Sequence, residues 1–275
     1  MKALDETVDL FGNEDIDAMV TAHTWPIWGR DDVLEQLESQ RDLYKYIHDQ
    51  TIRLANLGLT PDEIAEELKL PEKLDKVWAN QGYYGTLKHN VKAVYNFYLG
   101  YFNGNPSDLD PLPQEESGAK YVQYMGGEKK IIKQAKLDYK REYRWVAQVL
   151  KHVVMANPKI QKQKNLLAKA YEQLGYTAES SVWRNFYLIG ADELRNGVAD
   201  SKGSGGMMNL DTLLNMPMDD FLKFLSIKLN GMKAENKNMT FNLTFTDSKT
   251  NYTIDLNNSV LNFKKGKWRP TLMQH

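Results

Sequence analysis

Residues 82–100 read GYYGTLKHNVKAVYNFYLG, and this stretch decides how the rest of the chain is interpreted. If residues 86–102 form a helix, its apolar side chains gather in one broad arc. They are Leu87, Val91, Val94, Tyr95, Tyr98, Tyr101 and Phe102. His89, Lys92 and Asn96 fall on the opposite side. Such a helix is either a core element with a solvated face or one wall of a site.

Helical patterns extend outward from this stretch over residues 30–197. Apolar residues recur at intervals of three and four along residues 33–54, and Gly58 is a typical helix stop. Thr60, Pro61 and Glu63 then have the spacing of a capping box with proline at the first helical position. The region therefore predicts an all-α domain.

Residues 103–117 form a loop rich in Pro, Asp, Asn and Ser, after which helices and short turns alternate up to residue 195. The spacing loosely resembles that of tetratricopeptide repeats, although it is too short to define a repeat array. We expect Trp145, Tyr171 and Trp183 to pack in the core of this helical bundle.

The residues before the bundle predict a different structure. Residues 3–12 indicate a short helix, and residues 16–22, IDAMVTA, are nearly all apolar, which favours a buried strand of a parallel sheet. His23 follows directly, at the carboxyl end where ligands gather in open α/β folds. From the spacing alone, His23 is either a metal ligand or a structural residue of an aromatic-proline turn.

After the bundle, residues 198–206 are small and polar, which predicts a linker. Residues 207–275 then indicate an α+β domain, with two short helices, the second after Pro217, and alternating strands at 239–245, 251–256 and 259–263. Three strands and two helices are few for a core on both faces of a sheet. We therefore expect this last domain to be incomplete.

Composition narrows the functional classes. A formal net charge of −1 gives no indication of nucleic-acid binding. The chain has no cysteine and five histidines, so a metal would need His, Asp or Glu ligands. No apolar run reaches the roughly 20 residues of a transmembrane helix, and the N-terminus does not have the pattern of a signal peptide. These features predict a cytoplasmic location for the chain as given.

Five segments together carry a resemblance. HTWPIWG at 23–29, the stretch from Gly82 through NP at 105–106, PLP at 111–113, YRWVAQVL at 143–150 and ESSVWRNFYLIGADELR at 179–195 strongly resemble alkylsulfatases of the metallo-β-lactamase superfamily. The resemblance implies three parts: residues 1–29 as the end of a catalytic domain, residues 30–197 as an all-α dimerisation domain, and residues 207–275 as part of a sterol-carrier-like domain. The resemblance does not determine whether a complete protein would be exported.

The resemblance also implies zinc-dependent hydrolysis of alkyl sulfate esters such as dodecyl sulfate, with two zinc ions in a complete enzyme. This sequence lacks the family's H-x-H-x-D-H motif. By its position in HTWPIWG, His23 is similar to the family's last metal ligand. One histidine cannot hold two ions, because a catalytic zinc usually needs about three protein ligands. We therefore expect the chain to be inactive alone and not to retain zinc.

In the family, the helical domain closes over the active site near the sulfate. The resemblance implies catalytic roles for Tyr95 and His89, which would hydrogen-bond the sulfate as charge develops. It implies weaker, substrate-binding roles for Tyr83, Tyr84, Asn90 and Lys92.

Two alternatives remain to the interpretation that the chain is a portion of an alkylsulfatase. The chain could be a stand-alone dimerisation or interaction module without catalysis, or a lipid-binding protein built on its last domain. A homodimer is expected, because long apolar helix faces such as that of residues 33–54 need a cover.

Overall fold

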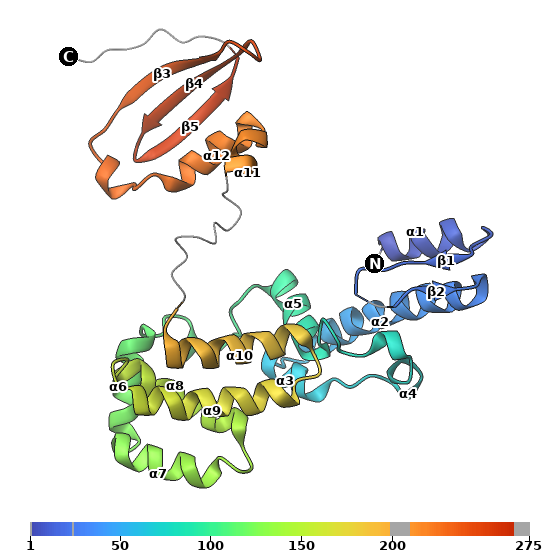
Figure 1. Cartoon of the computed structure of the whole chain (residues 1–275), viewed down its shortest axis with the longest axis vertical. Helices are drawn as coiled ribbons and strands as arrows, with labels where there is room; N and C mark the ends of the chain where they lie inside the picture. Colours follow the sequence, from blue (N-terminus) through green and yellow to red (C-terminus); the bar gives the residue numbers. More distant parts are fainter. Residues whose placement is uncertain (1, 24, 199–209, 267–275) are drawn as a thin grey trace. The chain divides into compact units, whose positions relative to one another are not determined.

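The computed structural model describes residues 2–23, 25–198 and 210–266, and it divides the chain into two compact units (Figure 1). The first unit is Met1–Ala199 and the second is Asp200–His275. Most of the linker predicted at 198–206 lies outside the described residues. The chain is mainly helical, with a small antiparallel sheet near its C-terminus, which confirms the predicted fold class.

The first unit begins with α1 (Lys2–Phe11), which packs against α2 (Arg30–Asn56). The prediction of a buried parallel strand at 16–22 is wrong. Only β1 (Ala18–Met19) forms there, it pairs antiparallel with β2 (Ile27–Trp28), and Val20 is 79% exposed. The apolar run predicted burial, but among the described residues β1 pairs only with the two-residue β2, across the turn that contains His23, and its contact with α2 does not bury it.

Helices α2, α3 (Pro61–Glu67) and α5 (Leu87–Leu99) enclose the first core of the unit. Its buried residues are Leu43, Ile47, Leu54, Ile64, Ala65, Leu68, Val91 and Tyr95. The predicted capping box is confirmed, because the Thr60 hydroxyl accepts from the Glu63 amide and the Glu63 carboxylate accepts from the Thr60 amide. Between α3 and α5 lie α4 (Glu72–Asp75) and η1 (Trp78–Asn80).

Helix α5 is shorter than predicted. Gly100, with φ of +79°, ends it at Leu99, because a left-handed backbone cannot continue a right-handed helix. Tyr98 and Tyr101 are 53% and 84% exposed, so their predicted place in a buried apolar arc is wrong.

The second half of the unit follows η2 (Pro106–Asp108) and has its own cores. It contains α6 (Gln114–Tyr124), α7 (Glu128–Asp138), α8 (Tyr143–Ala156), α9 (Gln161–Thr177) and α10 (Ser181–Asn196). Helices α9 and α10 lie side by side, and α8 packs on both α6 and α9 (Figure 1). Tyr171 packs against a core of this half as expected, whereas Trp183 is partly buried and belongs to none of the core clusters of the described residues. Trp145 is 49% exposed, so its predicted core position is wrong.

The second unit contains α11 (Leu210–Asn215), α12 (Met218–Lys228), η3 (Met232–Ala234) and three strands in the order predicted. These are β3 (Met239–Phe245), β4 (Thr250–Asn257) and β5 (Val260–Lys265), paired antiparallel with β4 in the centre. Leu222 of α12 packs with Tyr252 and Ile254 of β4, and the Tyr252 hydroxyl donates to Asp219 at 2.5 Å.

Candidate functional site

A cavity of about 870 Å³ opens in the first unit beside the predicted site stretch. Its walls come from α2, from the end of α3, from the segment between α4 and α5, and from the start of α10. His23, Tyr83, Tyr84 and Asn90 are among its lining residues. Apolar side chains such as Leu43 line it together with polar groups, a composition typical of small-molecule sites.

His23 reaches this cavity by stacking on Tyr84. The two ring centroids are 3.7 Å apart and the rings are inclined by 10°. Both side chains are exposed, so this nearly parallel stack holds the imidazole in a defined orientation in an otherwise open turn. The structure thus joins the aromatic-proline turn to the Tyr83–Tyr84 segment.

The start of α10 holds that segment in place. The Ser180 hydroxyl donates to the Tyr84 carbonyl at 2.6 Å, and the Ser181 amide donates to the Tyr83 carbonyl at 2.8 Å. Ser180 is 1% exposed and also caps α10, because its hydroxyl oxygen accepts from the Trp183 amide at 3.3 Å. One buried serine therefore fixes both a helix end and the backbone under the stacked tyrosine.

Of the residues on α5 that were predicted to belong to the site, only some line the cavity. Asn90 lines the cavity, whereas His89 is exposed outside it and its amide donates to the capping hydroxyl of Thr86 at 3.0 Å. Lys92 is exposed and forms an ion pair with Asp62. Tyr95 is 7% exposed and belongs to the core between α2, α3 and α5. The structure therefore brings together His23, Tyr83, Tyr84 and Asn90, and it does not bring His89, Lys92 or Tyr95 to them.

Glu66 is a charged residue of this region that the sequence reasoning missed. One oxygen of its carboxylate accepts from Arg144 and the other from Lys88, each at 2.6 Å. These hydrogen bonds, the one from Arg144 first, lower the pKa of Glu66 from 4.5 to about 2. Lys88 and Arg144 are distant in sequence from Glu66, so no local spacing could have indicated the group.

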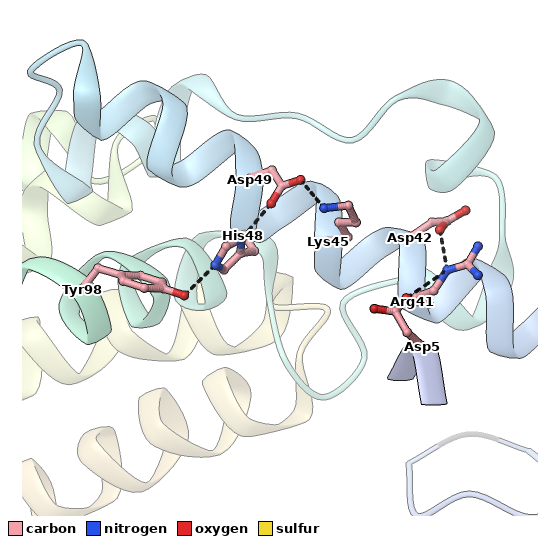
Figure 2. A network of polar contacts seen from close by, with 7 residues as sticks. All are labelled: Asp5, Arg41, Asp42, Lys45, His48, Asp49 and Tyr98. Atoms are coloured by element: carbon pink, nitrogen blue, oxygen red, sulfur yellow. Dashed lines mark hydrogen bonds and ion pairs between the residues drawn. The ribbon is translucent and has the colours of Figure 1, made fainter. Parts of the chain in front are cut away.

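A second polar network fixes α2 to its neighbours (Figure 2). The Nδ1–H of His48 donates to Asp49 at 2.8 Å, and in the neutral ring Nε2 accepts from the Tyr98 hydroxyl at 2.8 Å. Lys45 also bonds Asp49 at 2.8 Å, and the bonds from Lys45 and His48 lower the pKa of that carboxylate. The Tyr98 bond ties the end of α5 to α2, which carries one wall of the cavity.

Further along α2 lies a separate polar group, in which Arg41 bonds Asp42 at 2.9 Å and lies 4.0 Å from Asp5 of α1 (Figure 2). The two groups thus connect α2 to α1 at one place and to α5 at another. Helix α2 is in this way the common support of the N-terminal hairpin with His23 and of the α5 helix with Asn90.

The described residues do not form a metal site by themselves. Catalytic zinc requires about three protein ligands, and within residues 2–23, 25–198 and 210–266 no three His, Asp or Glu side chains lie close enough to share an ion. His23 supplies one imidazole only.

The first unit is thus a helical bundle with a mixed polar and aromatic cavity, and a separate α+β unit follows it in the chain. The family model described as alkyl sulfatase dimerisation matches residues 60–197, and that described as alkyl sulfatase C-terminal matches residues 207–272. The chain therefore belongs to the alkyl sulfatase dimerisation family, and the resemblance predicted from its motifs is confirmed.

Among curated proteins, the chain is 49% identical over 266 residues to a linear primary-alkylsulfatase of Pseudomonas sp, covering 96% of this chain and 39% of that protein. It is 44% identical to an alkyl/aryl-sulfatase of Saccharomyces cerevisiae, covering 96% and 41% respectively. A solved stereoselective inverting sec-alkylsulfatase from Pseudomonas sp. superimposes with a TM-score of 0.90 at 39% identity, over 98% of this chain and 42% of that one. The chain thus spans about two fifths of these relatives.

Proposed function

We propose that this chain is a portion of an alkylsulfatase that provides subunit association and one wall of the active site. The observation that carries the proposal is the cavity in which His23 stacks on Tyr84 beside Tyr83 and Asn90. These residues come from the HTWPIWG and Tyr-Tyr segments on which the resemblance rests, and the first unit matches the dimerisation family. The reaction would be hydrolysis of an alkyl sulfate ester.

The lining suits such a substrate. The Asn90 amide and the Tyr83 and Tyr84 hydroxyls can donate hydrogen bonds to sulfate oxygens. Leu43, Ile47 and other apolar side chains can cover an alkyl chain, with each buried methylene contributing about 0.8 kcal/mol. In this proposal the chain positions the substrate and has no turnover alone.

We predict that the complete enzyme uses zinc. In the complete enzyme, two ions would activate water for attack on the ester. Of the residues in this chain, His23 would contribute one imidazole to them, and the other ligands would come from outside the described residues. The predicted catalytic roles of Tyr95 and His89 also stay predictions, since neither side chain lines the cavity.

A chimera tests the proposal. The matching region of the Pseudomonas linear primary-alkylsulfatase is replaced by this chain, and sulfate release from decyl sulfate is measured. We expect an active chimera whose turnover falls at least about a hundredfold with His23→Ala, while the chain alone releases no sulfate. A folded but inactive chimera, or one indifferent to His23→Ala, would contradict the proposal.

The same chimera tests Tyr95. If the hydroxyl bonds the sulfate, Tyr95→Phe lowers turnover roughly ten- to a thousandfold and changes stability by less than about 1 kcal/mol. Unchanged turnover would assign Tyr95 to core packing alone. His89→Gln distinguishes the same alternatives for His89.

A further inference from the structure

A second cavity, of about 480 Å³, lies between the two halves of the first unit. Residues of α3 and α5 line one side, and residues of α8, α9 and α10 line the other. Its volume falls within the range of small-ligand sites. It shares Glu66, Lys88 and Trp183 with the first cavity, whereas Lys92, Arg144, Lys151 and Tyr187 line the second cavity and not the first.

The second cavity is rich in positive charge. Lys88, Lys92, Arg144 and Lys151 line it, and Glu66 is its carboxylate. Glu66 pairs with Lys88 and Arg144, and Lys92 pairs with Asp62. No ion pair of Lys151 occurs in the part of the chain that the structure describes. Two positive charges therefore remain after Glu66 and Asp62 are counted.

Lys88 and Arg144, which pair with Glu66, each have further N–H groups that can donate hydrogen bonds. A guanidinium has five N–H groups and an ammonium three, whereas Arg144 and Lys88 each donate one hydrogen bond to Glu66. An oxyanion can therefore bind these groups without displacing Glu66, which instead orients both cations. Lys151 is exposed on α8 and can approach the same anion.

Aromatic side chains form the remaining wall. Tyr171, Trp183 and Tyr187 are each partly buried, and the centroids of Tyr171 and Tyr187 are 6.0 Å apart. Ala147 and Leu174 add apolar surface. This wall offers contact to an apolar or aromatic body, which a bare inorganic ion does not have.

We propose that this second cavity binds an organic oxyanion, namely a sulfonate, a sulfate ester or a phosphate ester carried on an aromatic or alkyl body. The cations receive the anionic group and the aromatic wall receives the body. The site goes beyond the alkylsulfatase function proposed above and does not depend on it, because neither His23 nor a metal takes part.

Isothermal titration calorimetry on the full chain with 2-naphthalenesulfonate, which has no ester bond to hydrolyse, tests the site. We expect a dissociation constant below about 1 mM that rises with salt concentration. Inorganic sulfate and neutral 2-naphthol should each bind at least about tenfold more weakly, because sulfate has no aromatic body and 2-naphthol has no anionic group. Equal affinity for inorganic sulfate would overturn the organic ligand class, and no binding at about 1 mM would overturn the site.

Variants locate the binding. Lys151→Ala should weaken binding about tenfold, as expected for the loss of one charge-assisted hydrogen bond. Lys162→Ala removes the same charge from an exposed position of α9 outside both cavities and should change nothing. His23→Ala, which alters only the first cavity, should also leave the affinity unchanged. Weakening by His23→Ala, or none by Lys151→Ala, would overturn the assignment.

Discussion

The carboxylate of Glu66 connects three helices, and its lowered pKa determines how its contribution to stability changes with pH. Its folded pKa of about 2 lies below the ordinary 4.5, so its stabilising contribution is fully present above about pH 4.5. That contribution is lost as the pH falls through the range from about 4.5 to about 2. The side chain is 51% exposed, so solvent screening keeps the effect small.

We therefore expect Glu66→Gln to lower the free energy of unfolding by about 0.5–1 kcal/mol at neutral pH. The difference from the wild-type chain should shrink as the pH approaches 2. Urea denaturation across this pH range measures it. Glu67→Gln is the matched control, since Glu67 is an exposed neighbour with no ion pair among the described residues, and an equal loss in both variants would refute the role of Glu66.

The stack of His23 on Tyr84 can be tested without any enzyme assay. A ring 3.7 Å away shifts the proton resonances of the imidazole through its ring current. We expect Tyr84→Phe to keep the shifted His23 signals in the NMR spectrum, because the ring remains, and Tyr84→Ala to abolish the shift. Identical His23 signals in Tyr84→Ala and the wild-type chain would show that the rings do not stack in solution.

At the scale of single elements, α10 begins at a serine with two roles. Ser180→Ala removes both the helix cap and the partly buried hydrogen bond to the Tyr84 carbonyl. We expect a loss of about 1–3 kcal/mol in unfolding free energy. Ser181→Ala is the control, because Ser181 contributes its backbone amide, which alanine retains. Chemical denaturation showing equal stability for both variants would contradict the role of Ser180.

Elements were predictable from sequence where their signals are local. The Thr60–Glu63 capping box, the stop at Gly58 and the helix after Pro217 depend on neighbours within a few residues, and all three were found. The strand at 16–22 was mistaken because burial depends on a distant partner, which an apolar run does not specify. Trp145 was mistaken for the same reason: an aromatic residue on a helix can face outward.

The site shows the same division. Tyr83, Tyr84 and Asn90, which line the cavity, could be selected because they are close in sequence to residues 86–102, and His23 could be selected through its motif, while their roles stay predictions. The Glu66–Arg144 pair and the Ser180–Tyr84 bond join residues far apart in the chain. Tertiary packing creates such pairs, so neither periodicity nor spacing could reveal them.

For the whole molecule, we expect a homodimer. Phe97 is 79% exposed on α5 and Phe186 is 77% exposed on α10, both within the region that matches the dimerisation family. No helix in the described parts of the chain has the length and apolar character needed to cross a membrane. An obligate interface of this kind typically buries more than about 2,000 Å².

Light scattering coupled to size-exclusion chromatography should give twice the 31.7 kDa mass of one chain. Phe97→Ser and Phe186→Ser should raise the concentration at which the dimer dissociates. Ile227→Ser removes an equally exposed apolar residue from the second unit, outside residues 60–197, and should leave the mass unchanged. A folded wild-type monomer at about 10 µM would rule out the expected dimer.

The two halves of the first unit have separate cores, which has a consequence for how the chain folds. The core around Val91 draws on residues 43–95, and the core around Leu150 on residues 135–170, so each is built from contacts close in sequence. Local contacts form quickly, because short loops cost little entropy to close. Each half can therefore become structured before the contacts that join the two halves, such as the Glu66–Arg144 pair, which closes a loop of 78 residues.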